Sequence, residues 1–491
     1  MPSRIVDRFA RVRAAQPDKT LVIGATEGRS LTCDGLWQES ALIAETLSRA
    51  GLGPGSLVVS AAGNRVAALP LLLACWQRDV AVLPADRSTP RLEMRALVHQ
   101  WSPSAIVVQD DGPLSGAEWG RSVVGEALLP SGLRLHRFRQ DPAVETVRGC
   151  LLLKLTSGST GLPKATRTTE SNLWHEGWRI VEAMSIRPSD VQLGVIPLSH
   201  AYGMGNLVLP LLLQGTTVVL RESFVPATLA SDVAAFGVDV FPGVPFMFDH
   251  LATALPSAAL RRLRTTMTAG ARIDDRTVVA FHDRFGLKIH SFYGTSETGG
   301  ISYDDTDGVE TPVSVGKPMG GTTVTCVAVD GVEAPAGRVF VTSPTVADGY
   351  AGPGAVQEGF VDGGFLTGDL GALDARGHLR LTGRVSSFVN VAGKKVLPDE
   401  VERVLREMPA LRDVRVLGAP CPRRGEVLVA CVVGAGPSVS MLDVRQFCAA
   451  RLAPHKVPRE LLLLDAIPID ERGKTDRRRL DALVAARMGS S

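Results

Sequence analysis

The chain has 491 residues, more than one ordinary hydrophobic core can organise, so the sequence predicts two or more domains. Hydrophobic residues make up 45% and charged residues 21%, which is typical of a globular protein rather than of a disordered or membrane-embedded chain. The formal net charge of +2 gives no reason to expect a nucleic acid or an acidic membrane surface as a partner.

The cysteines and the N-terminus indicate a cellular location. None of the 7 cysteines is spaced as C-x-x-C, so neither a zinc site nor a disulfide framework is predicted, and a reducing cytoplasm is the simplest location. Residues 1–8 carry charges where a signal peptide needs an apolar stretch. The longest apolar run, residues 69–76, is too short to cross a bilayer. We therefore expect a cytoplasmic protein without an integral membrane contact, and the oligomeric state is left open.

From about residue 55 to 300, short apolar runs alternate with helix-like stretches. Strands are predicted at residues 57–60, 80–83, 105–109, 151–155, 192–196, 217–220, 238–241 and 288–292. Helices are predicted at residues 65–76, 173–184 and 226–236. This alternation is typical of an α/β fold with doubly wound parallel sheets covered by helices.

The pattern of the sequence changes after residue 310, where helix-like stretches give way to short strands. Short strands at residues 323–329, 338–342 and 378–381 stand between glycine- and proline-rich turns, which predicts a β-rich subdomain. From about residue 387 a small α+β domain is predicted, with helices at 398–407 and 441–452 and strands at 414–417, 428–433 and 460–464.

The clearest motif is the run T-S-G-S-T-G-L-P-K at residues 156–164, which follows a predicted apolar strand. Its hydroxyls, glycines and final lysine suit a loop that wraps a polyphosphate with backbone N–H groups. A turn that only ends a strand needs two or three such residues, and lysine is rare here, with 9 among 491 residues. Alanine follows the lysine, so the run is not a Walker loop. The predicted nucleotide-binding residues are Thr156, Ser157, Gly158, Ser159, Thr160, Gly161 and Lys164.

This run resembles the phosphate-binding signature of the adenylate-forming superfamily, which includes acyl- and aryl-CoA synthetases, peptide-synthetase adenylation domains and firefly luciferase. Further motifs match in order along nearly the whole chain and are most similar to those of acyl- or aryl-CoA ligases. The resemblance implies a large N-terminal domain at residues 1–383 that binds acid and ATP. It also implies a hinge at 384–388 that includes Ser386, and a small mobile C-terminal domain at 389–491.

A second block, S-F-Y-G-T-S-E-T-G, covers residues 291–299. An aromatic face can stack on adenine, a hydroxyl can meet the α-phosphate, and a carboxylate can hold a hard cation. The family pattern is Tyr-Gly-x-Thr-Glu, and Ser296 keeps the hydroxyl of the usual threonine. The resemblance implies that Tyr293 and Gly294 lie at adenine, that Ser296 binds phosphate and that Glu297 holds Mg²⁺. The segment T-A-G-A-R at residues 268–272 resembles the family segment on the other side of the adenine. The resemblance implies that Gly270 and Ala271 line that side.

Two later segments resemble the ribose site and the hinge. In T-G-D at residues 367–369, Asp369 matches the family's ribose-binding carboxylate, and a carboxylate accepts two hydroxyl donors well. Arg384 is expected on the ribose or phosphate side. The hinge departs from the family, because Ser386-Ser387, Asn390 and Lys394 replace the usual residues. These positions serve the thioester-forming conformation, so the departures concern the acceptor rather than adenylation.

Near the C-terminus, P-I-D-E-R-G-K at residues 468–474 resembles the family loop with the catalytic lysine. The carboxylate of the acid attacks the α-phosphate of ATP, and both groups are anionic. A cation between them offsets their repulsion and stabilises the in-line transition state. The resemblance therefore implies that Lys474 is catalytic.

The segment P-L-S-H-A-Y-G at residues 197–203 resembles the opening of the acid pocket in acyl- and aryl-CoA synthetases. His200 matches the pocket-gating residue, and we count it among the catalytic candidates. The other predicted acid-binding residues are Tyr202, Gly243, Val244, Ala269 and Gly294. Enzymes that select amino acids place an aspartate here to pair with the ammonium group, and a buried amine without one is unfavourable. An apolar slot predicts an aryl acid or a medium-to-long acyl acid.

The predicted function is activation of a carboxylic acid to acyl-AMP with release of pyrophosphate, followed by transfer to the thiol of coenzyme A. The expected cofactors and co-substrates are ATP, Mg²⁺ and coenzyme A. The altered hinge keeps a second acceptor open, the phosphopantetheine of an acyl or aryl carrier protein. A decayed, non-catalytic relative is disfavoured, because Glu297, Lys474 and the phosphate loop are all present. Luciferase-type oxygenation of the adenylate is a rare side branch that the sequence leaves open.

Overall fold

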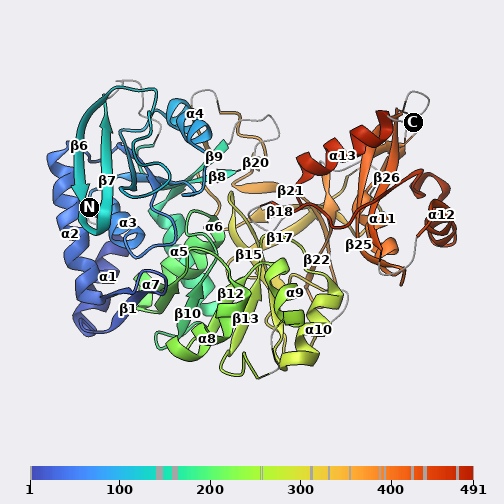
Figure 1. Cartoon of the computed structure of the whole chain (residues 1–491), viewed down its shortest axis with the longest axis horizontal. Coiled ribbons are helices and arrows are strands. Elements are labelled where there is room, and N and C mark those ends of the chain that lie inside the picture. The colour runs from blue at the N-terminus through green and yellow to red at the C-terminus, as the bar shows by residue number, and fades with distance from the viewer. Residues whose placement is uncertain are drawn as a thin grey trace. The chain divides into compact units, whose positions relative to one another are not determined.

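The computed structural model describes residues 3–139, 147–156, 164–254, 256, 258–309, 313–329, 332–352, 355–385, 389–391, 394–421, 425–434, 439–470 and 475–489. The chain forms two compact units (Figure 1). Unit 1 joins residues 1–323 with 341–365, and unit 2 joins residues 324–340 with 366–491. The domain boundaries expected from the sequence stay a prediction.

Unit 1 contains an eight-stranded sheet in the order β19-β9-β8-β4-β3-β5-β7-β6. Its strands are β3 (Leu57–Ala61), β4 (Ala81–Pro84), β5 (Ala105–Gln109), β6 (Val123–Leu129), β7 (Leu133–Phe138), β8 (Cys150–Thr156), β9 (Lys164–Thr169) and β19 (Tyr350–Ala351). The central strands β8, β4, β3 and β5 are parallel, and the outer strands pair antiparallel. All five residues of β5 are buried, as expected for a central strand covered on both faces.

A nine-stranded sheet of unit 1 has the order β16-β15-β14-β13-β12-β10-β11-β1-β2. Its strands are β1 (Thr20–Gly24), β2 (Arg29–Thr32), β10 (Val191–Gly194), β11 (Thr217–Leu220), β12 (Val240–Gly243), β13 (Thr265–Thr268), β14 (Ile289–Thr295), β15 (Gly299–Tyr303) and β16 (Lys317–Pro318). The six strands from β14 to β1 are parallel, and short hairpins add the antiparallel strands at both edges. The predicted α/β fold is confirmed, with mixed rather than purely parallel sheets.

Helices connect and cover these strands. They are α1 (Arg4–Ala15), α2 (Cys33–Arg49), α3 (Ala68–Gln77), α4 (Arg91–Trp101), η1 (Pro130–Gly132), α5 (Glu170–Ala183), α6 (Ala201–Gly203), the π-helical turn η2 (Met204–Val208), α7 (Leu209–Gln214), α8 (Pro226–Phe236), α9 (Pro245–Ala254) and α10 (Asp275–Phe285). The helices α1, α2 and α3 pack together near the N-terminus (Figure 1). Helix α5 begins with a capping box, in which Thr169 and Asn172 each bind the other's backbone N–H.

Helix α3 begins at Ala68, three residues later than the sequence predicts. The Glu27 carboxylate accepts a hydrogen bond of 2.9 Å from the backbone N–H of Val66 in the turn before the helix. A side chain that is distant in the sequence therefore binds this turn, a contact that a local pattern does not reveal.

A small β-sheet has the order β17-β18-β21-β20, with β22 paired to β21. Its strands are β17 (Thr323–Val327), β18 (Gly337–Thr342), β20 (Phe360–Val361), β21 (Gly364–Leu373) and β22 (Leu379–Arg384). The C-terminal part of unit 2 has a second sheet, β24-β23-β26-β25, with β27 on β26. Its elements are β23 (Val389–Val391), β24 (Lys394–Val396), α11 (Pro398–Arg406), β25 (Leu411–Cys421), β26 (Gly425–Gly434), α12 (Met441–Ala449), η4 (Pro454–Lys456), β27 (Glu460–Leu463) and α13 (Arg477–Gly489). The predicted β-rich segment and the α+β segment are both present.

Among the described residues, the structure contains no helix that is long and apolar enough to cross a membrane.

Candidate active site

The predicted phosphate loop connects two neighbouring antiparallel strands. Strand β8 ends at Thr156 and β9 begins at Lys164, and these two residues pair with each other. The predicted binding residues Ser157, Gly158, Ser159, Thr160 and Gly161 lie outside the described residues. The strands on either side of the run therefore pair as a β-hairpin, whereas a helix follows the loop in Walker motifs.

Lys164 and Glu297 both lie next to Tyr350, a residue outside the predicted motifs. The Tyr350 hydroxyl donates a hydrogen bond of 2.8 Å to Glu297 Oε1, and Lys164 Nζ lies 5.1 Å from the centre of the Tyr350 ring. The backbone N–H of Ala347 donates to the Glu297 carbonyl oxygen at 2.8 Å. Burial and the Glu297 carboxylate raise the pKa of Tyr350, so its hydroxyl stays protonated and donates to that carboxylate.

The chemistry of these donors fits a hard cation at Glu297. Among the described residues, no group of three or more His, Cys, Asp or Glu side chains is placed to hold a metal ion. Mg²⁺ is typically held by one or two carboxylates together with phosphate oxygens of the substrate, and it keeps several waters. A single carboxylate oriented by Tyr350 matches this pattern better than it matches a metal cage made only of protein ligands.

The block at residues 291–299, which begins within β14, is connected to strand β9 by a hydrogen bond. The Thr166 hydroxyl of β9 donates a hydrogen bond of 3.2 Å to the carbonyl oxygen of Ser296. Tyr293 is 8% exposed, and the β14–β15 register shifts between Tyr293 and Gly294. A Cβ atom at Gly294 would lie 2.5 Å from the carbonyl oxygen of Gly299, so only glycine fits this close approach of two strands.

Four predicted segments lie at the carboxyl ends of neighbouring strands of the nine-stranded sheet. The parallel strands β10, β12, β13 and β14 are consecutive neighbours in the sheet. Residues 197–203 and 269–271 follow β10 and β13, whereas residues 243–244 and 293–297 include the last residues of β12 and β14 and those directly after them. Ligands of open α/β sheets bind outside the carboxyl ends of the strands. The topology thus brings the predicted acid segment, the pocket wall and both sides of the predicted adenine site to the same end of the sheet, where the parallel strands have their carboxyl ends.

Individual residues at this end of the sheet differ in exposure. Ala269 is 5% exposed, whereas Gly270 and Ala271 are exposed, and Gly270 has a φ of +86°, which favours glycine. Gly243 is buried, and a Cβ atom there would lie 3.0 Å from the ring of Phe248, so a larger residue would crowd that ring. Val244 is half-buried and packs against the hydrophobic core.

The predicted acid segment at residues 197–203 forms close contacts with neighbouring backbone atoms. His200 precedes helix α6, and its carbonyl oxygen accepts a hydrogen bond of 2.9 Å from the N–H of Met204. A Cβ atom at Gly203 would lie 2.2 Å from the carbonyl oxygen of Pro197, so the chain can turn here only with glycine. The Tyr202 hydroxyl donates to the Met267 carbonyl oxygen at 3.2 Å, and the Tyr202 ring lies 5.9 Å from that of Phe292. Burial raises the pKa of Tyr202.

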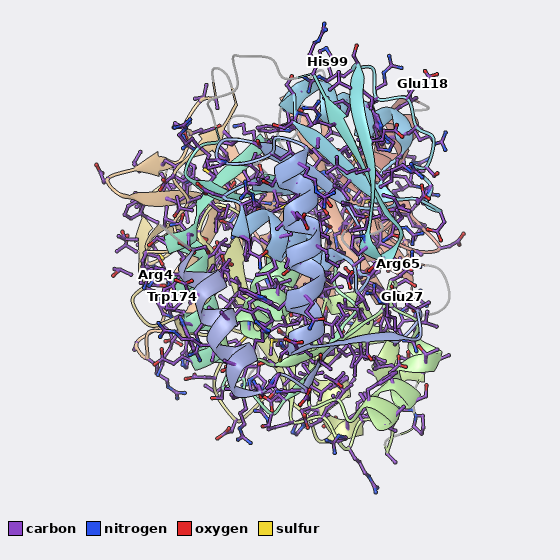
Figure 2. The ribbon with its side chains drawn as sticks, turned by 90° about the vertical axis from the view of Figure 1, so that its left-hand side faces the viewer. Arg4, Glu27, Arg65, His99, Glu118 and Trp174 are labelled. Carbon is purple, nitrogen blue, oxygen red and sulfur yellow. The ribbon has the colours of Figure 1, made fainter. Side chains whose placement is uncertain are left out.

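Asn64, which the sequence analysis also missed, fixes the strand that precedes the acid segment. Its side-chain amide donates to the carbonyl oxygens of Gly194 and Ile196 at 3.4 and 2.9 Å and accepts from the N–H of Leu198 at 2.8 Å. The next residue, Arg65, lies beside Glu27 at 3.8 Å (Figure 2). On the same face, the Arg4 guanidinium covers the Trp174 ring at 4.5 Å (Figure 2).

Replacing Asn64 by alanine is expected to lower the free energy of unfolding by about 1–3 kcal/mol, because the Ile196 carbonyl and the Leu198 N–H lose their hydrogen bonds to the Asn64 side chain, whereas the Gly194 carbonyl keeps the N–H of Arg221. The KM for the acid is expected to rise while the KM for ATP stays near its original value. Urea denaturation and steady-state kinetics measure both effects. The exposed amide Gln38, replaced by alanine, is the control. An unchanged KM for the acid in a folded variant would contradict the role of Asn64.

The predicted ribose residues lie in unit 2. Asp369 and Arg384 face each other across β21 and β22, and Arg384 Nε lies 2.9 Å from Asp369 Oδ1. Arg384 is 65% exposed and Asp369 15%, so the carboxylate is held while the guanidinium faces solvent. The hinge residue Ser386 and the catalytic candidate Lys474 lie outside the described residues. Ile469, the second residue of the predicted lysine loop, and Thr475, the residue directly after it, pair as an antiparallel bridge.

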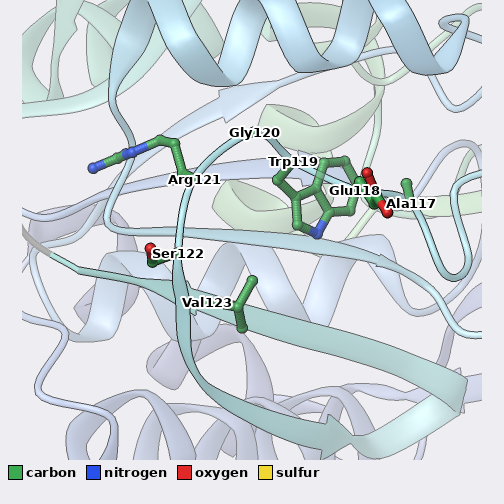
Figure 3. A pocket seen from close by; sticks show the side chains of 7 residues that line it. All are labelled: Ala117, Glu118, Trp119, Gly120, Arg121, Ser122 and Val123. Atoms are coloured by element: carbon green, nitrogen blue, oxygen red, sulfur yellow. The ribbon is translucent and has the colours of Figure 1, made fainter.

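A shallow hollow lies elsewhere in unit 1, over residues Ala117–Val123 (Figure 3). Its lining is one continuous segment of chain that ends at the first residue of β6. Trp119 is 3% exposed, and its ring packs 5.6 Å from that of His136. No predicted site residue lines this hollow.

Comparison with known proteins defines the class. The family model described as AMP-binding enzyme matches residues 9–351, and that of the AMP-binding enzyme C-terminal domain matches residues 400–474. The chain therefore belongs to the AMP-binding enzyme family.

Particular relatives cover almost the whole chain. Feruloyl-CoA synthase of an Amycolatopsis species is 32% identical over an alignment of 461 residues, and the match covers 91% of this chain and 92% of that protein. Fatty acid–[acyl-carrier-protein] ligase ScoC of Streptomyces coeruleorubidus is 26% identical and covers 95% of this chain and 94% of its own. The crystal structure of ATP-bound MatB from Rhodopseudomonas palustris has a TM-score of 0.85 at 24% identity, with 97% of this chain and 98% of that chain covered, and shares the fold.

These findings confirm the predicted superfamily and the α/β fold with a large N-terminal and a small C-terminal part. They also confirm, at the level of the family, the prediction of an acyl-AMP-forming ligase that uses ATP, Mg²⁺ and coenzyme A. The roles of individual residues stay predictions.

Proposed function

We propose that the enzyme activates an aryl acid or a medium-to-long acyl acid as its acyl-AMP and transfers the acyl group to coenzyme A. The observation that carries this proposal is the gathering of four motif-bearing segments at the carboxyl ends of β10, β12, β13 and β14. The name of the Amycolatopsis relative, a feruloyl-CoA synthase, supports an aryl acid as the substrate class.

In the first half-reaction, a carboxylate oxygen of the acid attacks the α-phosphorus of ATP. The new O–P bond forms as the bond to the β-phosphate breaks, and pyrophosphate leaves. Lys474 offsets the repulsion between the two anions, and Glu297 would hold Mg²⁺, which would supply charge neutralisation on the phosphates. Thr156, Lys164 and Ser296 bind the phosphates, Tyr293 covers the adenine, and Asp369 with Arg384 binds the ribose.

In the second half-reaction, the thiol sulfur attacks the acyl carbon of the adenylate. The C–S bond forms, the C–O bond to AMP breaks, and the thiol proton passes to water. The described pocket residues support an apolar acid, since Tyr202, Val244, Ala269 and the nearby Phe292 carry no charge. A substrate ammonium group would therefore be buried without a counter-charge, which is unfavourable.

A carrier-protein phosphopantetheine is the second acceptor. The observation that favours it is the departure of Ser386-Ser387 from the acidic residues usual at the hinge. The relative ScoC, whose name describes a fatty acid–[acyl-carrier-protein] ligase, supports the same alternative.

An acid panel tests the proposed function. Purified enzyme with MgATP is incubated with aryl acids, fatty acids of graded length and amino acids, and pyrophosphate release is measured. We expect aryl or longer acyl acids to give the highest kcat/KM. Faster release with amino acids would contradict the proposed substrate class. Adding coenzyme A or a phosphopantetheinylated carrier protein to the best acid then identifies the acceptor.

A further inference from the structure

A buried ion pair lies between β8 and α5. Lys154 Nζ and Glu176 Oε2 are 2.8 Å apart, and each side chain is only 4% exposed. Lys154 stands within the otherwise apolar run of β8, two residues before Thr156. Burying two charges is unfavourable unless their geometry is good, so such a pair demands a specific reason.

The Glu176 carboxylate also touches the backbone of two other segments. A Cβ atom at Gly299 would lie 3.1 Å from Glu176 Cδ, and a Cβ atom at Gly205 would lie 3.1 Å from Glu176 Oε1. Gly299 has a φ of +64° and begins β15, two residues after Glu297. Gly205 lies in η2, directly after the predicted acid segment. The carboxylate is thus in contact with three segments, each beside a predicted part of the active site.

Lys154 connects this contact to the phosphate hairpin. It pairs across the sheet with Thr166 of β9, whose hydroxyl donates to the carbonyl oxygen of Ser296. Two separate chains of contacts therefore connect the hairpin strands β8 and β9 to the turn that carries Glu297. One connection runs through Lys154, Glu176 and Gly299, and the other through Thr166 and Ser296.

We propose that Lys154 and Glu176 are positioning residues for MgATP. The pair holds β8 and β9 at a set distance from the turn with Glu297, so that triphosphate and metal meet their ligands together. Separating the pair would leave each charge buried and unpaired, which makes this spacing stiff. The inference rests on the proposed function, because it takes Glu297 as the metal ligand.

The decisive test uses the double variant Lys154→Met/Glu176→Gln, which removes both charges and nearly keeps the side-chain lengths. We expect its thermal midpoint to stay close to that of the parent. The Kd for MgATP, measured by calorimetry without an acid, is expected to rise about tenfold or more, the typical effect of losing support for a metal ligand. The KM for the acid in pyrophosphate exchange is expected to change little.

The control is another buried lysine–acid pair of unit 1. Lys288 Nζ lies 2.9 Å from Asp304 Oδ2, with side chains 7% and 13% exposed. These residues lie at the opposite end of the β14–β15 hairpin, roughly 20 Å along the strand from Glu297. The variant Lys288→Met/Asp304→Asn is expected to leave the Kd for MgATP unchanged. A purely structural role of Lys154 and Glu176 would lower the amount of folded enzyme and leave this Kd as it is.

A second variant, Glu176→Asp, keeps both charges but shortens the reach by one methylene, so it tests positioning if the double variant fails to fold. We expect a weaker Kd for MgATP here too. A Kd equal to that of the parent in the folded variants overturns the proposal. If the parent binds MgATP but activates no acid in the panel, the proposed function fails, while the Kd comparison still decides the role of the pair.

Discussion

Replacing Lys474 by alanine is expected to abolish measurable acid-dependent pyrophosphate exchange, a loss of at least about 10²–10³-fold. Without the cation, the carboxylate of the acid and the α-phosphate approach each other with their repulsion unopposed. The exchange of radiolabelled pyrophosphate into ATP measures this half-reaction directly, since it does not involve the thiol acceptor.

The matched control for this variant is another lysine of the C-terminal part. Lys456 Nζ lies 2.7 Å from Glu400 Oε1 in a partly exposed ion pair, whose loss is expected to change stability by at most about 1 kcal/mol. Lys456→Ala should therefore keep its exchange activity. Near-normal exchange in a folded Lys474→Ala enzyme would refute the catalytic assignment.

Replacing Glu297 by glutamine is expected to lower kcat/KM for MgATP by about 10²-fold or more, because a metal that neutralises phosphate charge contributes several kcal/mol. The glutamine amide keeps the size of the side chain and can still accept from Tyr350, but it is a poorer ligand for Mg²⁺. Titration of Mg²⁺ at fixed ATP should show a higher requirement for the metal.

The companion variant Tyr350→Phe removes only the hydrogen bond of 2.8 Å to Glu297 Oε1. We expect a smaller loss, about 10-fold, with the same shift in the Mg²⁺ titration, as is typical of residues that orient a metal ligand. If Glu297→Gln lowered activity without any shift in the Mg²⁺ requirement, Glu297 would not be the metal ligand.

Much of the fold could be predicted because its central strands are short apolar runs between turns. Strands β5 and β11 and helix α8 begin and end at the predicted residues. The antiparallel strands β9 and β15 were not predicted as strands. Strand β9 has three threonines, a lysine and an arginine among its six residues, and β15 contains two glycines, so neither has an apolar run. Their pairing with a neighbour rather than their own composition determines their structure.

The candidate site likewise contains residues that local motifs predict and residues that they do not. The motifs at residues 156–164 and 291–299 stand out locally because hydroxyls, glycines and a carboxylate occur together in a short stretch. Asn64, Lys154, Glu176 and Tyr350 are single polar residues with partners between 22 and 134 positions away. One signal was available, namely that a rare lysine interrupts the apolar run of β8. Its partner Glu176 could not be inferred from the sequence alone.

The sequence by itself determined the family, the order of the motifs and the class of chemistry, because each motif combines its reactive groups within nine residues or fewer. Only the tertiary structure decided that the strands beside the phosphate run pair as a hairpin, that Tyr350 donates a hydrogen bond to Glu297 and that Lys154 forms an ion pair with Glu176. The physical reason is that strand pairing and ion pairing join residues according to their distance in space, whereas a motif records only their distance along the chain.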